Sequence, residues 1–187
     1  MRKPSPASST AHVGLDLGLK DTATCSNFYR HLEAKLGIAQ RAKQKKRVKA
    51  IHAKIKNKRK DALQKFTTKL VCENELIVVG NVSSSALAKT TMAKSVLDAG
   101  WFMLKTQLKC KAIARSVVFE EVNEAYTTQT CSCCGSISVN SPKGRAGLGI
   151  REWMCAECGT LHDRDVNAAR NILAAGHSRL VGGILAL

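Results

Sequence analysis

Residues 12–21 form a short apolar run broken by glycines, His12-Val13-Gly14-Leu15-Asp16-Leu17-Gly18-Leu19-Lys20-Asp21. This pattern predicts a strand over His12–Leu17, followed by a turn. Asp16 stands between two leucines of that strand, and a carboxylate on a core strand needs a partner. Far along the chain, Asp165 stands where the last helical pattern begins. Hard divalent cations prefer carboxylate oxygens, so both acids are candidate metal ligands if the fold brings their distant segments together.

The rest of the pattern predicts one main domain with a small inserted module. At 187 residues, the chain is long enough to bury one good core. Helical periodicity fills residues 28–72, and strands and helices then alternate. The other expected elements are strands at Thr22–Cys25, Leu76–Val79 and Val117–Val122, a loop at Ser83–Thr91, and helices at Ala93–Ala114 and from about Asp165. This alternation predicts an α/β layer domain that ends in a helix.

Basic residues are concentrated in the middle of the helical region. The formal net charge is +16, and no acidic residue interrupts residues 41–60. Salt bridges within a helix therefore cannot explain the run, and a solvated helix face is the alternative to a nucleic-acid contact. A phosphate backbone is favoured over an anionic membrane. The candidate contacts are Lys43, Lys45, Lys46, Arg47, Lys49, Lys56 and Arg59.

The N-terminus and the hydropathy pattern argue against a membrane partner. No segment reaches the apolar length of a transmembrane helix, and a signal-peptide core is missing. Residues 1–10 are polar and contain Pro4 and Pro6, which predicts a disordered arm.

Four of the eight cysteines form two Cys-x-x-Cys-Gly pairs, Cys131 with Cys134 and Cys155 with Cys158. Two such turns can close a tetrahedron of thiolates around zinc, and four thiolates leave no position for a catalytic water. The pairs therefore predict a structural Zn²⁺ site, whereas a redox centre would need only one pair.

The other four cysteines are assigned no metal. Cys133 lies beside the first pair, and the glycine that follows Cys134 favours Cys134 as the ligand. The remaining three are expected to be small core residues: Cys25, Cys72 and Cys110.

Aromatic residues, which stack on bases in many single-strand grooves, make up only 4% of the chain. Trp101, Tyr126 and Trp153 are the candidates for such stacking. Core or ribbon packing is the equal alternative for each.

Several motifs, in order from about Val13 to the C-terminus, resemble one family. They are Gly14-Leu15-Asp16-Leu17-Gly18, Ile77-Val78-Val79, residues 93–101, Thr127-Thr128-Gln129-Thr130-Cys131-Ser132 with Cys134-Gly135, and Asp163-Arg164-Asp165-Val166-Asn167-Ala168-Ala169. Together they resemble TnpB, the transposon-encoded, RNA-guided DNA nuclease family ancestral to the type V CRISPR effectors. The resemblance implies an α/β fold of the RuvC type, which is RNase H-like, with an inserted zinc ribbon. It also implies a guide RNA, target DNA, and metal-dependent DNA cleavage.

The resemblance also predicts boundaries and location. The RuvC-like domain would span residues 11–129, with the basic helical pair at about 28–72. The zinc ribbon would span residues 130–162, and residues 163–187 would form the last helix and a tail. A location in the prokaryotic cytoplasm, associated with the nucleoid, is expected.

The family site holds Mg²⁺ or Mn²⁺ with an Asp of the first strand, a Glu after a later strand and an Asp that opens the last helix. Asp16 and Asp165 match the first and third, but Gly80 stands at the second position and offers no ligand. Either the nuclease is inactive, or the carboxylate has moved to the end of the neighbouring strand. Glu124 is then the candidate catalytic residue, with Glu121 as its substitute, and surface glutamates at a strand end are the alternative.

Family members also carry an N-terminal half that holds the guide RNA, and only a short arm precedes Asp16 here. We therefore expect a truncated or decayed copy, or a separate chain that supplies the missing half. Three functions follow as hypotheses: a RuvC endonuclease, an inactive RNA- or DNA-binding module, and a decayed transposon fragment.

Overall fold

A three-stranded parallel sheet forms the centre of the molecule. Its strands are β1 (His12–Leu15), β2 (Leu76–Gly80) and β3 (Val118–Val122), in the order β1-β2-β3. In the register, Leu15 lies opposite Val79, and Val79 lies opposite Glu121. β2 is buried along its whole length, as the middle strand of a parallel sheet covered on both faces must be. These strands confirm the three expected from the apolar runs at residues 12–17, 76–79 and 117–122.

The computed structural model describes residues 11–17, 28–82, 100–144 and 146–184. The predicted strand at Thr22–Cys25, the predicted loop at Ser83–Thr91 and the first part of the helix predicted from Ala93 lie outside these ranges. The remainder of that helix is α5 (Trp101–Arg115).

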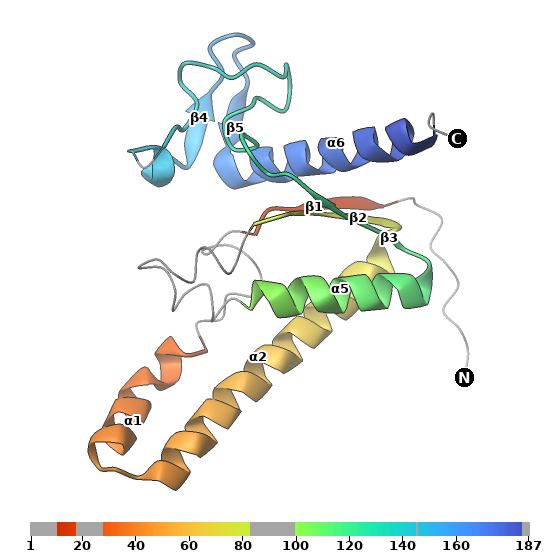
Figure 1. The fold of residues 1–187 in the computed structure, drawn as a ribbon. Helices are drawn as coiled ribbons and strands as arrows, with labels where there is room; N and C mark the ends of the chain where they lie inside the picture. The colour runs from red at the N-terminus through yellow and green to blue at the C-terminus, as the bar shows by residue number, and fades with distance from the viewer. Residues whose placement is uncertain (1–10, 18–27, 83–99, 145, 185–187) are drawn as a thin grey trace.

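Helices cover both faces of the sheet (Figure 1). Helix α6 (Arg164–Ile184) packs on one face, where Ile172 meets Leu76, Val78 and Val122. Helices α2 (Lys45–Glu73) and α5 pack on the other, where Leu63 and Leu104 join a cluster with Ile77 and Val79. Alternate residues of each strand thus point into two separate cores, one on each face of the sheet. The sheet and the helices on its two faces form a three-layer α/β arrangement. Within the described ranges, no helix combines the length and apolar character needed to cross a membrane.

Helix α6 lies unusually close to the sheet because glycines replace side chains at two contact points. A Cβ placed on Gly14 of β1 would overlap the backbone carbonyl of Ala169 and come within 2.9 Å of Leu173 Cβ. A Cβ placed on Gly176 of the helix would overlap the side chain of Val78. Both glycines are therefore required by the packing, and Asp165 is carried toward β1 by the same approach.

Helices α1 (Arg30–Arg41) and α2 form a hairpin that extends beyond the sheet (Figure 1). Leu36 and Ala39 of α1 are buried, as is Ile55 of α2. Only the second half of α2 reaches the main core, through Leu63 and Val71. The basic first half of α2 thus lies outside the main core, where α1 packs beside α2.

The cysteine-rich segment forms a small module at the start of α6 (Figure 1). Its strands β4 (Glu152–Met154) and β5 (Leu161–Asp163) pair antiparallel, with Trp153 opposite His162. The helix begins at the residue after β5. The expectation that Cys72 and Cys110 are core residues is wrong, because both lie exposed on α2 and α5. Each helix buries only one face, and these positions fall on the other.

Gly14→Ala should destabilise the protein, because the added methyl group meets the backbone of α6, which cannot rotate away. We expect the free energy of unfolding to fall by about 1–3 kcal/mol, the usual cost of overpacking a core. Urea unfolding followed by circular dichroism measures this.

Gly182→Ala is the matched control. Gly182 is exposed on α6, the helix that Gly14 contacts, and a Cβ at position 182 meets nothing within 4 Å. This variant should be as stable as the wild type or slightly more so, because alanine favours helix over glycine. Equal stability of the Gly14→Ala and Gly182→Ala variants would contradict the close packing described above.

Candidate metal centres

Asp16 follows β1 and lies on the side of the sheet that faces α6. Val13 and Leu15 pack into the cluster on the opposite face, so the alternation along the strand turns Gly14 and Asp16 toward α6. Burial, and then the negative charge of Asp165, raise the pKa of Asp16 to about 6. Arg164 opposes that rise. Asp16 is therefore held close to a second acid in a partly desolvated place.

Glu124 lies directly over Gly80, the position where the family pattern has a glutamate. A Cβ on Gly80 would overlap Glu124 Oε2 and lie 3.2 Å from Glu124 Cβ. Burial, and then the charge of Asp16, raise the pKa of Glu124, while Lys105 lowers it. Glu124 Oε2 is buried and has no hydrogen-bond partner in the described part of the chain. The glycine thus leaves room for a carboxylate that comes from the neighbouring strand.

Asp165 lies in the first turn of α6 without serving as the helix cap. Asp163 takes that role, because its Oδ1 accepts hydrogen bonds from the amides of Asp165 at 3.0 Å and Val166 at 2.8 Å. The Asp165 side chain pairs instead with Arg151, with 2.7 Å between Oδ2 and Nη1. Arg151 was not singled out in the sequence, where nothing marks it as a partner of an acid fourteen residues away.

Glu121, the substitute candidate, lies elsewhere. Its side chain forms an ion pair with Lys105 of α5 at 2.8 Å, and it lies opposite Val79, which belongs to the core on that face. Glu121 is therefore directed away from Asp16, whereas Glu124 interacts with Asp16.

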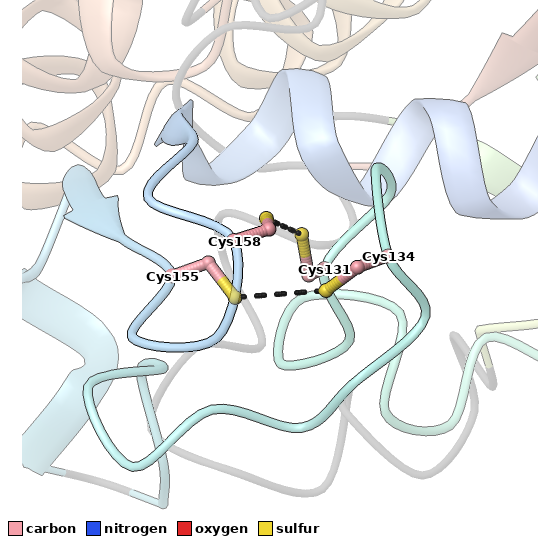
Figure 2. A group of neighbouring side chains, drawn as sticks. All are labelled: Cys131, Cys134, Cys155 and Cys158. Carbon is pink, nitrogen blue, oxygen red and sulfur yellow. Dashed lines mark hydrogen bonds between the residues drawn. The ribbon is translucent and has the colours of Figure 1, made fainter.

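The cysteines form a tighter group than the acids do. The Sγ atoms of Cys131, Cys134, Cys155 and Cys158 all lie within 4.8 Å of one another, the only such cluster of metal-ligating side chains in the described ranges. Figure 2 shows the four side chains converging from two turns, with 3.6 Å between Cys131 and Cys158 and 3.8 Å between Cys134 and Cys155. A tetrahedral zinc with Zn–S bonds of about 2.3 Å separates its sulfurs by about 3.8 Å. The group could therefore hold a metal ion such as zinc.

The environment of the thiols differs from one cysteine to the next. The hydroxyl and amide of Thr160 lower the pKa of Cys158 to about 6, and the amide and hydroxyl of Ser136 lower that of Cys134. Burial raises the pKa of the Cys131 thiol to about 11. A bound cation would offset the cost of ionising Cys131 in a buried place, because the thiolate is the form that binds a metal.

His162 is a further residue of this centre that sequence reasoning missed. It is 3% exposed, packs on the ring of Trp153, and places Nε2 3.0 Å from Cys131 Sγ. With its proton on Nε2, His162 donates a hydrogen bond to that sulfur. A hairpin that pairs His162 with Trp153 would have placed His162 beside the cysteines, but the sequence analysis did not predict the two strands of this hairpin.

Asn167 and Asn171 of α6 connect the cysteine module to the acids. Both side-chain amides donate to the carbonyls of Thr127 and Thr130, at 2.7–3.2 Å. Asn167 Oδ1 also accepts the amide of Ser132, inside the first cysteine turn. The segment that follows Glu124 is thereby fixed to the helix that carries Asp165.

The basic candidates divide into two groups. Arg59 is partly buried, with its side chain packed against Gly100 at the start of α5. The others are exposed along the hairpin between α1 and α2: Lys43, Lys45, Lys46, Arg47, Lys49 and Lys56.

Comparison with known proteins matches this architecture. Residues 28–91 match the family model described as "Probable transposase" (OrfB_IS605), and residues 101–172 match the "Cas12f1-like, TNB domain". A cryo-EM structure of the Cas12f1–sgRNA–target DNA complex superposes with a TM-score of 0.52 at 18% identity, covering 79% of this chain and 42% of that one. The fold is therefore of the RuvC type, α/β and RNase H-like, with an inserted zinc ribbon.

Sequence relatives agree. A protein of Streptomyces pristinaespiralis named as an RNA-guided DNA endonuclease is 35% identical over 92% of this chain and 47% of its own length. InsQ of Escherichia coli, which carries the same kind of name, is 33% identical over 94% of this chain and 51% of its own length. A TnpB-like protein of Acanthamoeba polyphaga mimivirus is 31% identical over 75% of this chain and 27% of its own length. The chain thus spans about half the length of the first two relatives, and it belongs to the TnpB family.

Proposed function

We propose that this chain is the nuclease part of an RNA-guided DNA endonuclease, with Asp16, Glu124 and Asp165 as its metal ligands. The observation that carries the proposal is the position of Glu124, whose carboxylate occupies the space that a side chain on Gly80 would need. The missing family glutamate is thereby replaced from the neighbouring strand. The chain's relatives, named as RNA-guided DNA endonucleases, support the assignment to DNA cleavage.

The donor set fits Mg²⁺ or Mn²⁺. Two carboxylates have raised pKa values, the charge of Asp16 contributes to the rise at Glu124, and a buried oxygen of Glu124 lacks a partner in the described ranges. Such an arrangement is unfavourable by itself and becomes favourable when a cation neutralises it. Bound there, the cations would activate a water and offset the charge that develops on the leaving oxygen of a phosphodiester.

The protein's own groups prepare the site for a phosphate. Asp163 caps α6, which leaves the carboxylate of Asp165 available. Arg151 brings a guanidinium from the ribbon to the edge of the site, where it can bind a phosphate oxygen once cations occupy the carboxylates. Asn167 and Asn171 hold the Glu124 segment in place relative to Asp165.

Guide RNA and target DNA are the partners we infer. The exposed lysines and arginine of the α1–α2 hairpin present positive charge on a projecting rod, where no acid intervenes over residues 41–60. The Cas12f1 structure contains both an sgRNA and target DNA, which supports this pair of ligands. The proposed DNA substrate and the bacterial sources of the first two relatives favour action at the nucleoid, in the prokaryotic cytoplasm.

Zinc is the metal we propose for the four cysteines, in a structural role. Four thiolates complete its coordination and leave no position for a water. The site stabilises the loop that carries Arg151 and the turn bonded to Asn167. Zinc would therefore support the acids indirectly, by fixing their neighbours.

A nuclease-inactive binding module is the second candidate, together with a decayed transposon fragment. A binding module would hold nucleic acid with a steep salt dependence and cut nothing, and a decayed fragment would do neither.

Cleavage of labelled single-stranded DNA with Mg²⁺ or Mn²⁺ tests the carboxylate assignment. Asp16→Asn and Glu124→Gln should each reduce the cleavage rate by more than about 100-fold. Loss of a residue that only hydrogen-bonds to a metal ligand already reduces metal affinity or activity by about 10–100-fold. Glu121→Gln is the matched control and should cut normally, since it loses only an exposed ion pair with Lys105.

A swap variant makes this test sharper. Glu124→Gly alone should be inactive, whereas Glu124→Gly combined with Gly80→Glu should recover cleavage by restoring the family arrangement. Wild-type cleavage by Glu124→Gln would show that Glu124 is not a ligand. Absence of cleavage in the folded, zinc-loaded wild type would favour the binding module or the fragment.

The raised pKa of Asp16 predicts a pH-dependent stability in Mg²⁺-free buffer. The folded protein holds this proton up to about pH 6, against an ordinary value of 3.8, so the free energy of unfolding falls as pH rises through that window. Asp16→Asn should therefore be the more stable protein at pH 7.5, by at most about 3 kcal/mol, and the gain should shrink toward pH 5. Thermal unfolding without chelator, to keep the zinc bound, measures the difference. An Asp16→Asn variant that is less stable at pH 7.5 would contradict it.

Zinc content tests the ribbon. The purified chain should carry a single zinc ion, Cys155→Ser should lose it and lower the melting temperature, and Cys133→Ser should keep it. Elemental analysis by mass spectrometry gives the stoichiometry. Zinc loss in the Cys133→Ser variant with retention in Cys155→Ser would reverse the ligand assignment.

A further inference from the structure

All eight phenylalanine, tyrosine and tryptophan residues of the sequence lie in the described ranges, and they differ in solvent exposure. Trp101 and Trp153, two of the stacking candidates, are 2% and 4% exposed and belong to the cores. The exposed aromatic residues are Phe102, at 76%, and Tyr126, at 64%. Tyr126 is thus the stacking candidate that is free to meet a ligand.

The backbone of Tyr126 is in the left-handed region, with φ of 65°. The other described non-glycine residues with positive φ, Lys43 and Ser116, follow the ends of α1 and α5, where this conformation is an ordinary helix ending. Tyr126 follows no helix; it lies between β3 and the ribbon. An aromatic residue in this conformation is strained, and such strain persists only where surrounding contacts enforce it.

Those contacts are present on both sides of the residue. The Tyr126 carbonyl accepts hydrogen bonds from the amides of Gln129 and Thr130, both at 2.9 Å, and from the Thr130 hydroxyl at 3.0 Å. The Thr127 hydroxyl donates to the Glu124 carbonyl at 2.8 Å. Asn167 and Asn171 then fix this turn to α6. The turn therefore fixes the backbone of an exposed aromatic residue, and the ring contacts within the described residues do not involve Tyr126.

Tyr126 lies close to one of the proposed metal ligands. Residues two apart in a chain have Cα atoms within about 7 Å, so Tyr126 lies next to Glu124, whose carboxylate covers Gly80. The chain carries a net charge of +16, which attracts nucleic acid to this surface as to the rest of the molecule. An exposed aromatic residue on a fixed backbone, close to a phosphodiester site, suits an unpaired base, because stacking accepts any base.

We propose that Tyr126 stacks on an unpaired base of the DNA strand whose phosphate lies at Asp16, Glu124 and Asp165, and so positions that strand. The inference rests on the proposed function and adds a substrate contact to it. It requires single-stranded DNA at the site, because a base within a duplex is already stacked between its neighbours on both faces. Its hydroxyl is not needed for stacking, so phenylalanine should replace it.

Photocross-linking to the full chain tests this contact independently of cleavage. The probe is oligothymidylate with 5-iodouracil at successive positions, bound in low salt with Ca²⁺ in place of Mg²⁺ so that the strand stays intact. The wild type should cross-link through Tyr126, as identified by mass spectrometry of the peptide. Tyr126→Phe should still cross-link there, and Tyr126→Asn, whose side chain tolerates positive φ, should not.

Binding of the same oligonucleotide gives a second measurement. Tyr126→Asn should raise the Kd roughly 5- to 100-fold, while Tyr126→Phe should stay close to the wild type. Phe102→Ala is the matched control, an equally exposed aromatic outside the turn, and should change neither the cross-link nor the Kd. Melting temperatures of all variants establish that each is folded.

The outcomes separate this inference from the proposed function. Cross-linking at Tyr126 without cleavage in Mg²⁺ would support the stacking and count against the nuclease. Cleavage that is normal in Tyr126→Asn, with cross-links elsewhere or at Phe102, would overturn the stacking and leave the nuclease intact.

Discussion

The closeness of α6 to the sheet is the constraint on which the remaining structure depends. Because Gly14 has no side chain, the backbone of the helix at Ala169 rests against β1 itself. Gly176 allows the same contact with Val78 two turns further along. The start of this helix carries Asp165, and the strand continues into Asp16, so the spacing between helix and sheet also sets the spacing between the acids. A bulkier residue at either glycine would change the packing and the site together.

The second consequence is electrostatic. Asp165 raises the pKa of Asp16, and Asp16 raises that of Glu124, with burial as the larger cause for both. Lys105 and Arg164 reduce these rises without cancelling them, since both pKa values stay raised. The fold therefore keeps like charges together at the expense of stability, a pattern usual where function needs the groups unpaired.

Much of this could be predicted from the sequence, because local patterns carry it. The apolar strands, the parallel sheet and the two helical stretches follow from periodicity, and the cysteine spacing predicted the four-sulfur cluster. Side-chain direction was harder to predict. The sequence favoured Glu124 and kept Glu121 as its substitute, because the choice depends on the direction of Glu121 on β3 and of Glu124 just after that strand. Arg151 and His162 were missed because the folding of the ribbon decides which residues they contact. The exposure of Cys72 was missed because only a narrow face of α2 is buried, and Cys72 lies outside that face.

Helix α2 has a mechanical consequence. Its 29 residues make a rod of roughly 43 Å, anchored in the core at one end and loaded with positive charge at the other. Two residues, Asn74 and Glu75, separate α2 from β2, and hydrogen bonds hold both of them. The amide and side chain of Asn74 donate to the Leu70 carbonyl, and the amide of Glu75 donates to the Ala11 carbonyl. A ligand bound at the far end, such as the nucleic acid proposed above, would therefore act on a long lever arm. This arm is joined through Asn74 and Glu75 to the strand that ends in Gly80, beneath the carboxylate of Glu124.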